Sequence, residues 1–503
     1  MRIIDDVKQR LNLAANKLTE EAIYAILGIF IVSIFVIVSF SYYSFVLFVA
    51  CFLALAIIII RKPAIGIYIT IFCTFVFERH YTLLPIYYDD YVIKIYPLDI
   101  VLAITVLALL LRVTIGKRPQ FKAKLIELPM LIFSGIFALF FAASFFMSSK
   151  FEIAFSTFKN FILYMIFYVL IINLIKSRDQ LRRMFYAMLA AGIAIVVFIA
   201  LGMVTGSGIW SEYMPLSTFG DRLLAGPHAW YAVILIVGMF CYLAWKKRSQ
   251  NVVILLWGFI LVLLLGISFS LVRHLWIALF LALFVCLIFF TIKQRNRVFK
   301  LVAISALLIF LAVVVLGLVY SWQGKTNALQ SDLTYSIEQR FTSLFDYNSP
   351  DSSVAWRFTA WQKAWGEMTN SYFLGIGLGK ELIFDFEGYE SIIEVRELHN
   401  DFVSVALQLG LVGLVSFVVM ILSWIIFFKR NYKKITNQYK PFFIASFGLI
   451  IAFIFNATFS GYFDVNLWVI TIWIFVGCLV VITSLSKKES VSAKALLGNK
   501  IIR

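Results

Sequence analysis

The sequence predicts an all-α membrane protein, a polytopic bundle of about 14 transmembrane helices with one long, partly helical external loop. Two observations predict this class. Hydrophobic residues make up 62% of the chain and charged residues 14%, whereas soluble domains carry roughly 45–50% and about 25%. The apolar residues also form runs long enough to cross a bilayer, and basic residues gather between alternate runs. No soluble core could bury this excess.

Each run qualifies as a spanning helix because about 20 apolar residues cover the hydrocarbon core of a bilayer. The third run is short, so the expected count has a margin of one. The fourteen runs lie near residues 22–40, 43–60, 64–78, 97–114, 129–147, 153–175, 184–205, 227–245, 251–269, 274–292, 301–320, 403–428, 441–459 and 467–485.

The basic residues indicate an orientation. Thirty-two of the 44 Lys and Arg residues fall in the N-terminal segment, in alternate loops and in the C-terminal tail. Because basic residues concentrate in cytoplasmic loops, we expect a multi-pass protein with both termini in the cytoplasm. The net charge of +17 then reflects topology and contact with anionic membrane lipids. A nucleic-acid partner is not expected, because no soluble domain carries a basic patch.

Residues 321–402 form one long external segment, with six basic residues against twelve carboxylates. Loops of this length are usually functional. We therefore expect three parts: residues 1–320 with eleven helices, the external segment, and residues 403–503 with three helices and a cytoplasmic tail. Residues 3–18 have apolar residues at helical spacing, which fits an amphipathic helix on the cytoplasmic surface or a plain soluble cap.

The second half of the external segment is expected to be mostly helical. Residues 353–369 include Trp361 and further tryptophans at helical spacing, which suits the membrane interface. A glycine run follows at 373–379 and includes Gly377; it lets the backbone turn sharply and approach a ligand closely. A tight turn between two loop helices is the alternative. A nucleotide site is rejected, because the glycines do not follow a strand in a Rossmann unit.

His399 and Asn400 lie at the end of this segment, just before the twelfth apolar run. The unperturbed pKa of histidine lies near physiological pH. At an outer membrane boundary, His399 is therefore a candidate to remove a proton from a hydroxyl group. The alternative is a histidine on the surface or in a helix cap.

Three further cations are candidates. Arg273 lies between two apolar runs that leave almost no loop, where an ionisable residue is costly and a functional candidate. Its guanidinium matches phosphate oxygens, and snorkelling to the interface is the alternative. By the same reasoning Lys159, within the sixth run, is a candidate, and pairing inside the bundle is its alternative. Arg222, in an external loop with Gly and Pro, is weighed against a salt bridge with Asp221.

The external cations and His399 together favour a pyrophosphate-bearing lipid at the outer leaflet and an incoming hydroxyl group. The cytoplasmic loops are too short to build a site for ATP or a nucleotide sugar, so the energy must be stored in the substrate. No cofactor and no metal are expected. The five cysteines lie in apolar runs without paired spacing, and they indicate neither disulfides nor a metal site.

Four motifs follow one another in a specific order: Arg357-Phe-Thr-Ala-Trp361, the glycine run, His399-Asn400 and Gln408-Leu-Gly-Leu-Val-Gly413. Their order and spacing resemble the bacterial O-antigen ligase and O-antigen polymerase superfamily. The resemblance runs from about residue 222 to residue 413, and Arg273 fits the family's arginine at the start of a helix. The first two hundred residues resemble the family only in their hydropathy pattern.

The resemblance implies a metal-independent, inverting membrane glycosyltransferase, similar to the GT-C type. Such enzymes take a glycan from undecaprenyl pyrophosphate on the periplasmic or external side of the bacterial cytoplasmic (inner) membrane. Ligases transfer it to a hydroxyl of lipid A–core, and polymerases transfer it to a growing glycan. By this resemblance His399 is the general base or positions the acceptor, while Arg273 and Arg357 hold the pyrophosphate and stabilise its leaving charge. The substrate-binding candidates are Arg222, Arg340, Lys159, Asn400, Trp361 and Gly377.

Ligase and polymerase both stay open. His228 stands where the family often has an asparagine after the proline, and fourteen spans lean toward a polymerase. A secondary transporter would show inverted repeats and broken helices near the midplane, and no repeat is present. A membrane protein that binds a lipid-linked oligosaccharide without catalysis is a further alternative. A metal-dependent glycosyltransferase would require a carboxylate pair such as Asp89-Asp90, which fits a solvated loop better.

Overall fold

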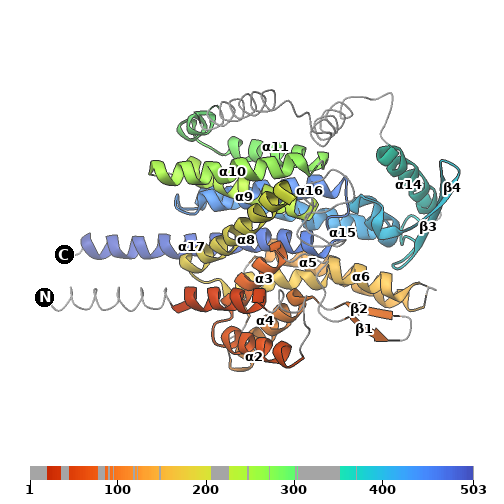
Figure 1. Ribbon diagram of the computed structural model, residues 1–503, viewed down its shortest axis with the longest axis horizontal. Coiled ribbons are helices and arrows are strands. Elements are labelled where there is room, and N and C mark those ends of the chain that lie inside the picture. Colours follow the sequence, from red (N-terminus) through yellow and green to blue (C-terminus); the bar gives the residue numbers. More distant parts are fainter. Residues whose placement is uncertain are drawn as a thin grey trace. The chain divides into compact units, whose positions relative to one another are not determined.

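The computed structural model is almost entirely helical, which confirms the predicted all-α class (Figure 1). The structure describes residues 20–34, 45–76, 85–88, 91–94, 96–116, 119–121, 123, 124–146, 149–205, 226–245, 249–270, 272–300, 303, 352–369 and 371–501.

Within those ranges, nine helices are long and apolar enough to cross a membrane. They are α4 (Pro97–Thr114), α5 (Lys124–Ser144), α6 (Phe151–Phe161) with its continuation α7 (Ile166–Leu174), α8 (Arg178–Thr205), α9 (Gly226–Trp245), α10 (Gln250–Phe269), α15 (Asp401–Asn431), α16 (Lys440–Ala457) and α17 (Asn466–Ile501). Three apolar helices are shorter: α2 (Phe45–Arg61), α3 (Ala64–Val76) and α11 (Arg273–Ile288).

These helices lie where the apolar runs predicted them, but two of the runs are interrupted, and one of these, 403–428, contains the non-helical Gly410. The run at 153–175 is not one continuous helix, because a 3-10 turn, η1 (Leu163–Met165), separates α6 from α7. The expected span at 301–320 and the expected amphipathic segment at 3–18 lie outside the described residues.

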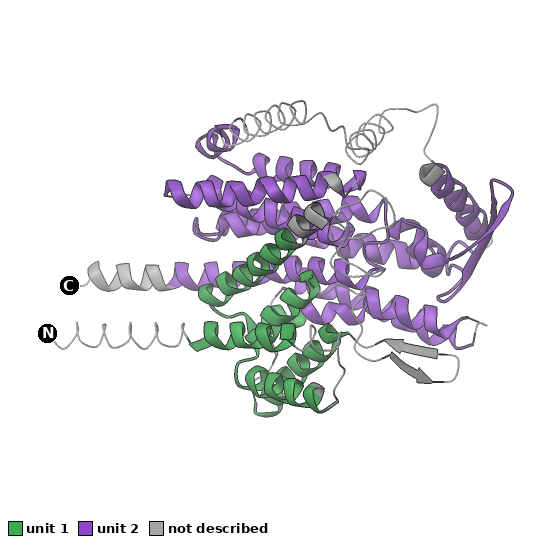
Figure 2. Ribbon diagram, in the orientation of Figure 1, with its two compact units in different colours: residues 1–120, 169–215 green, residues 121–168, 216–503 purple. Residues whose placement is uncertain are grey.

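The chain forms two compact units (Figure 2). Unit 1 comprises residues 1–120 and 169–215. Its central helix is α3, which is buried along its whole length and packs against α4 and α8. Gly66 of α3 lies against Thr105 of α4, where a Cβ atom would be 2.0 Å from the threonine hydroxyl oxygen. Unit 1 also contains an antiparallel pair of strands, β1 (Pro85–Tyr88) and β2 (Tyr91–Lys94).

Unit 2 comprises residues 121–168 and 216–503 and holds the segments that carry the predicted motifs. Most residues of α9 and α17 are buried, as expected of helices that are apolar all round and lie inside a bundle. Helix α16 packs against α9, α11 and α17, and α15 packs against α5. Trp424 of α15 and Trp473 of α17 are fully buried, with ring centroids 5.6 Å apart.

The external segment contains a helix and a β-hairpin. Helix α14 (Ser352–Thr369) packs against the strand β3 (Glu381–Phe386), which pairs antiparallel with β4 (Tyr389–Glu394). The hairpin differs from the mostly helical structure expected here. Its two-residue turn, Glu387-Gly388, has positive φ at both positions (55° and 81°), which is the geometry of a type I′ turn between twisted strands.

Connections of unit 2 gather at two ends. At one end Lys150, before α6, donates its backbone N–H to Gly379 at 2.9 Å, and Tyr462, before α17, donates its backbone N–H to Asp401 at 2.8 Å. At the other end the Tyr432 hydroxyl donates to the Phe289 carbonyl at 2.8 Å. Figure 1 shows α14 and the hairpin at the end of unit 2 opposite the C-terminal end of α17. Alternate connections therefore share an end, as a chain that crosses a bilayer repeatedly requires.

Candidate functional site

Helix α15 is broken at Gly410, and the glycine run fills the break. Gly410 has non-helical backbone angles (φ 63°, ψ −164°). The N–H groups of Ile376 and Gly377 donate to the carbonyls of Leu407 and Gln408 at 2.8 and 3.1 Å. A Cβ atom on Gly375 would lie 2.5 Å from the Leu407 carbonyl oxygen. Residues 371–379, which include the glycine run, are therefore joined closely to the backbone of α15 and do not form a simple turn between two helices. We call residues 371–379 the glycine joint.

The break sets the depth of the site. Residues 411–431 would extend about 31 Å as a helix, which matches the roughly 30 Å hydrocarbon core of a bilayer. We expect the first part of α15, before Gly410, to project beyond the hydrocarbon. His399 precedes α15 and therefore lies outside the candidate span, Asp401–Lys434.

His399 has an uncommon backbone conformation. Its φ is +52°, which costs free energy for a side chain with a Cβ atom and persists only where the surroundings impose it. On one side Leu398 is fully buried in the core beneath α14. On the other side the Asn400 side chain caps α15, accepting from the N–H groups of Phe402 and Val403 at 3.0 and 3.1 Å. A buried anchor and a helix cap thus fix the direction of the imidazole.

Helix α14 supplies the surroundings of the imidazole. The Trp356 ring lies edge-on to His399 with centroids 5.8 Å apart, and the Trp361 indole donates to the Leu398 carbonyl at 2.7 Å. Burial, reinforced by the positive charge of Arg357, lowers the pKa of His399 to about 4. The imidazole is therefore neutral at physiological pH and can accept a proton. The structure thus brings together three predicted residues, His399, Arg357 and Trp361.

Polar side chains on either side of His399 bind the segment 394–401 to α6 and to the residues before α17. The sequence reasoning missed this cluster. Arg396 pairs with Glu394, donates to the Ser156 hydroxyl at 2.7 Å and lies 3.9 Å from Asp464. Burial raises the pKa of the Asp464 carboxyl to about 7, although the Arg396 guanidinium opposes the rise. The fully buried Asp401 accepts the backbone N–H groups of residues 462 and 463 at 2.8 and 2.9 Å. Carboxylates beside apolar runs, in 400–401 and 464–466, were the available signal.

Arg273 lies at the first residue of α11 and is half-buried. The adjacent His274 ring lies edge-on to Tyr462, with centroids 6.0 Å apart, and the Tyr462 ring stacks on Trp468 at 4.1 Å. Because the backbone of Tyr462 is bound to Asp401, these contacts bring the start of α11 to the same end of unit 2 as His399.

The other predicted residues have separate positions. Lys159 is half-buried in the last turn of α6, next to Asn160, whose side chain donates to the Asp464 carbonyl. Gly377 is buried in the glycine joint. Arg222, Arg340 and the Asp89-Asp90 pair lie outside the described residues. Among the side chains that the structure does describe, no group of three His, Cys, Asp or Glu residues is arranged to hold a metal ion.

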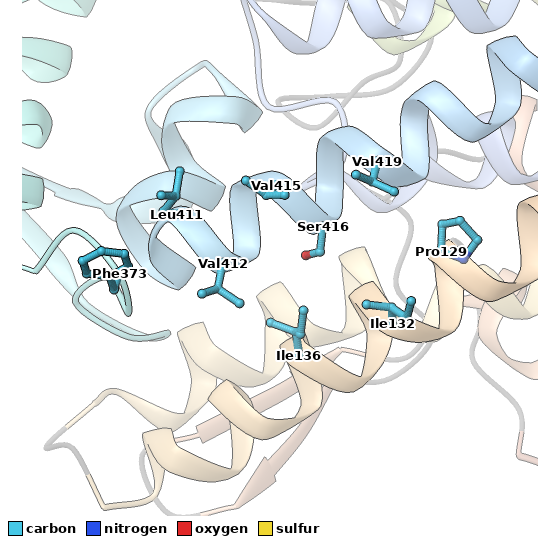
Figure 3. Close-up of a pocket in the computed structure, with 9 residues that line it drawn as sticks. All are labelled: Pro129, Ile132, Ile136, Phe373, Leu411, Val412, Val415, Ser416 and Val419. Atoms are coloured by element: carbon cyan, nitrogen blue, oxygen red, sulfur yellow. The ribbon is translucent and has the colours of Figure 1, made fainter.

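An apolar groove of about 470 Å³ begins beside the glycine joint (Figure 3). Phe373 and Leu411 line one end, and the groove continues between α5 and α15. Ser416 supplies the polar atom that Figure 3 shows among the lining side chains. The remaining lining residues are Pro129, Ile132, Ile136, Val412, Val415 and Val419. The groove thus follows the spanning part of α15, below the break at Gly410.

The fold and the site together define a class: a multi-pass membrane protein whose histidine and arginine candidates gather at one end of a helix bundle. Residues 258–418 match a family model described as O-Antigen ligase. This match places that part of the chain in the O-antigen ligase superfamily and confirms the resemblance of the motifs. The matched region contains Arg273, Arg357 and His399, and it supports a membrane function in glycan transfer or ligation. No curated protein matches the chain.

Proposed function

We propose that the protein transfers a glycan from undecaprenyl pyrophosphate to an acceptor hydroxyl on the outer face of the bacterial cytoplasmic membrane, without a metal ion. The acceptor oxygen attacks the anomeric carbon and forms the new glycosidic bond. The bond from that carbon to the pyrophosphate oxygen breaks with inversion, and undecaprenyl pyrophosphate leaves with the electron pair. His399 takes the proton of the hydroxyl group.

The observation that carries the proposal is the state of His399. A general base must be unprotonated and aimed before the reaction begins. The lowered pKa of about 4 keeps the imidazole unprotonated at physiological pH, at the cost of a weaker base, and the fixed backbone between Leu398 and Asn400 directs the side chain. The same Arg357 that disfavours an imidazolium would also bind the negatively charged leaving group.

The pyrophosphate is held, in this proposal, by Arg357 and Arg273. Guanidinium groups offer forked donors that match phosphate oxygens. Arg273 begins a helix, where the positive end of the helix dipole adds to its attraction for an anion. Arg222, Arg340 and Lys159 remain secondary candidates for the same role.

The apolar groove offers a surface for the lipid chain of the donor. Its lining consists almost wholly of hydrocarbon side chains, and Phe373 at its end belongs to the glycine joint. An isoprenoid chain that lay along α15 would have its pyrophosphate near the membrane boundary, where residue 410 ends the spanning helix. The acceptor is lipid A–core for a ligase and a growing glycan for a polymerase.

The test uses purified protein in nanodiscs with EDTA and an undecaprenyl-pyrophosphate-linked oligosaccharide. Candidate acceptors are added separately. We expect transfer with release of undecaprenyl pyrophosphate, and we expect His399→Ala to slow it by about 10²–10⁴-fold, the usual contribution of a general base. Arg357→Ala and Arg273→Ala should also lose transfer, and the acceptor that reacts distinguishes ligase from polymerase.

Arg430→Ala is the matched control, because this exposed arginine lies at the far end of α15. It should transfer the glycan at the wild-type rate. Equal binding of the lipid by wild type and all variants, with no turnover by any acceptor, would refute a glycosyltransferase. Transport by proteoliposomes would then be the next measurement.

A further inference from the structure

A second groove, of about 450 Å³, lies in the external segment between α14 and β3. We call it the α14–β3 groove. Its lining differs from that of the apolar groove beside the glycine joint, because five of its eight lining residues carry polar side chains: Thr359, Gln362, Lys363, Glu367 and Asp385. We propose that the α14–β3 groove binds the glycan chain of the donor or the acceptor; this inference rests on the proposed glycan transfer and names where the sugar lies.

The chemistry of the lining fits a neutral, hydroxyl-rich ligand. Hydroxyl, amide, ammonium and carboxylate groups offer both donors and acceptors, which sugar hydroxyls require. Lys363 forms an ion pair with Glu367 at 2.8 Å, so its charge is already compensated, and Asp385 leaves the groove with a net negative charge. A pyrophosphate would be repelled here, in contrast to the surroundings of Arg357.

Two ring contacts connect the groove to the candidate site. Phe384 lines the groove and also lies 5.8 Å from the Trp356 ring, which itself contacts His399 at 5.8 Å between centroids. The lining residues of α14 run from Thr359 to Glu367, a distance of about 12 Å at 1.5 Å per residue. A glycan whose reacting end lay at His399 could therefore extend along this groove.

Gly366 gives independent support. It lies in α14, and a helical glycine is less stable than alanine. Close packing does not explain it, because a Cβ atom added there would meet no atom within 4 Å. Its missing side chain instead leaves the wall of the groove open.

The test compares two substitutions at one position. Gly366→Trp should fill the α14–β3 groove without disturbing the core, and Gly366→Ala should leave it open. The probes are oligosaccharides of one and three repeat units, released by mild acid from the surface polysaccharide of the producing cell. We expect calorimetry with the full-length protein in nanodiscs to show wild-type affinity for Gly366→Ala and at least tenfold weaker binding for Gly366→Trp.

Gln362→Ala and Asp385→Ala should weaken binding of the three-unit probe by about threefold or more. Glu390→Ala is their control, because Glu390 is exposed and pairs with Asp385 in the hairpin but does not line the groove. Unchanged affinity in Gly366→Trp, or no binding by wild type, would overturn the inference.

Turnover separates this inference from the proposed function. If Gly366→Trp raises KM only for a donor with a long glycan, the groove holds the donor. If Gly366→Trp raises KM only for a long acceptor, the groove holds the acceptor. If Gly366→Trp transfers the glycan with unchanged KM, the proposed function holds and glycan binding in the α14–β3 groove is refuted. If the wild type binds the probe but transfers nothing, and Gly366→Trp loses the binding, the groove is supported and the proposed function is refuted.

Discussion

At the scale of single residues, His399 and Glu387 are the non-glycine residues with positive φ in the described part of the chain. The turn of the hairpin accounts for Glu387, since a type I′ turn requires that conformation. No hairpin surrounds His399. Its conformation instead follows from a buried Leu398 before it and a cap at Asn400 after it, which is the pattern expected where a side chain must be aimed.

The charge of Arg357 should set the acid limit of the reaction. Because a positive neighbour disfavours the imidazolium, it lowers the pKa of His399 in addition to burial. We expect kcat/KM of the wild type to stay level as pH falls from 7 toward 5 and to decline near pH 4. Arg357→Gln should move this decline to higher pH, since burial alone then lowers the pKa.

Arg357→Lys is the control for that pH profile, because it keeps the positive charge and should keep the decline near pH 4. The overall rate can fall in both variants through weaker pyrophosphate binding, so the quantity to compare is the pH at which kcat/KM declines. A decline at the same pH in Arg357→Gln and in the wild type would contradict the electrostatic coupling between Arg357 and His399.

From sequence, local composition singled out His399 and Trp361, a histidine and an aromatic residue before an apolar run, and the family resemblance singled out Arg357. The structure brings these three residues together, and their roles stay predictions. Sequence reasoning missed Arg396 and Asp464. Their pairing joins residues 68 positions apart in the chain and depends on burial, and a single sequence displays neither property.

At the scale of elements, the glycine joint connects the external segment to α15 through backbone atoms. The N–H of Leu411 donates to the Tyr372 carbonyl at 2.8 Å, in addition to the two bonds from Ile376 and Gly377. A Cβ atom on Gly410 would lie 2.3 Å from the Phe373 carbonyl oxygen. The two backbones can approach this closely only because each contributes a glycine at the contact.

Gly375→Ala should therefore disrupt the joint. Its φ of 65° costs about 1–2 kcal/mol for alanine, and the contact with Leu407 adds a clash. We expect a lower melting temperature and reduced transfer. Gly388→Ala is matched in backbone strain (φ 81°) but meets no neighbour, so the excess loss in Gly375→Ala measures the close contact. Equal losses in both variants would mean that the joint contributes nothing beyond strain.

Among elements, sequence reasoning located the apolar helices but not the β3–β4 hairpin or the break in α15. Helices of this type are specified by hydropathy alone, which a single sequence carries. The hairpin had a weak local signal, a glycine in the Glu387-Gly388 dipeptide between two segments that contain β-branched and aromatic residues, 381–386 and 389–394. The break at Gly410 had none, because a glycine inside an apolar run is compatible with an unbroken helix.

At the scale of the whole molecule, the charge pattern predicts which end of unit 2 faces outward. We expect Glu390→Cys, in the hairpin, to react with a membrane-impermeant maleimide in intact cells. Lys429→Cys, at the far end of α15, should react only after permeabilisation. Both positions are exposed, whereas Cys73, Cys241, Cys286 and Cys478 are buried.

The background for that labelling is Cys51→Ser, since Cys51 is half-buried. The unsubstituted background protein should stay unlabelled in both conditions. Labelling of Lys429→Cys in intact cells, with Glu390→Cys protected, would invert the predicted orientation and place the candidate site in the cytoplasm.

The break in α15 also has a consequence for how the protein is made. Backbone groups freed from a helix are costly in a membrane unless something nearby binds them. The partners of Leu407, Gln408 and Leu411 are supplied by residues 372–377, which leave the ribosome before them. In the proposed orientation, those residues have already been translocated when the broken helix reaches the insertion machinery. Synthesis order thus delivers the partner segment to the membrane boundary before the break in α15 arrives there.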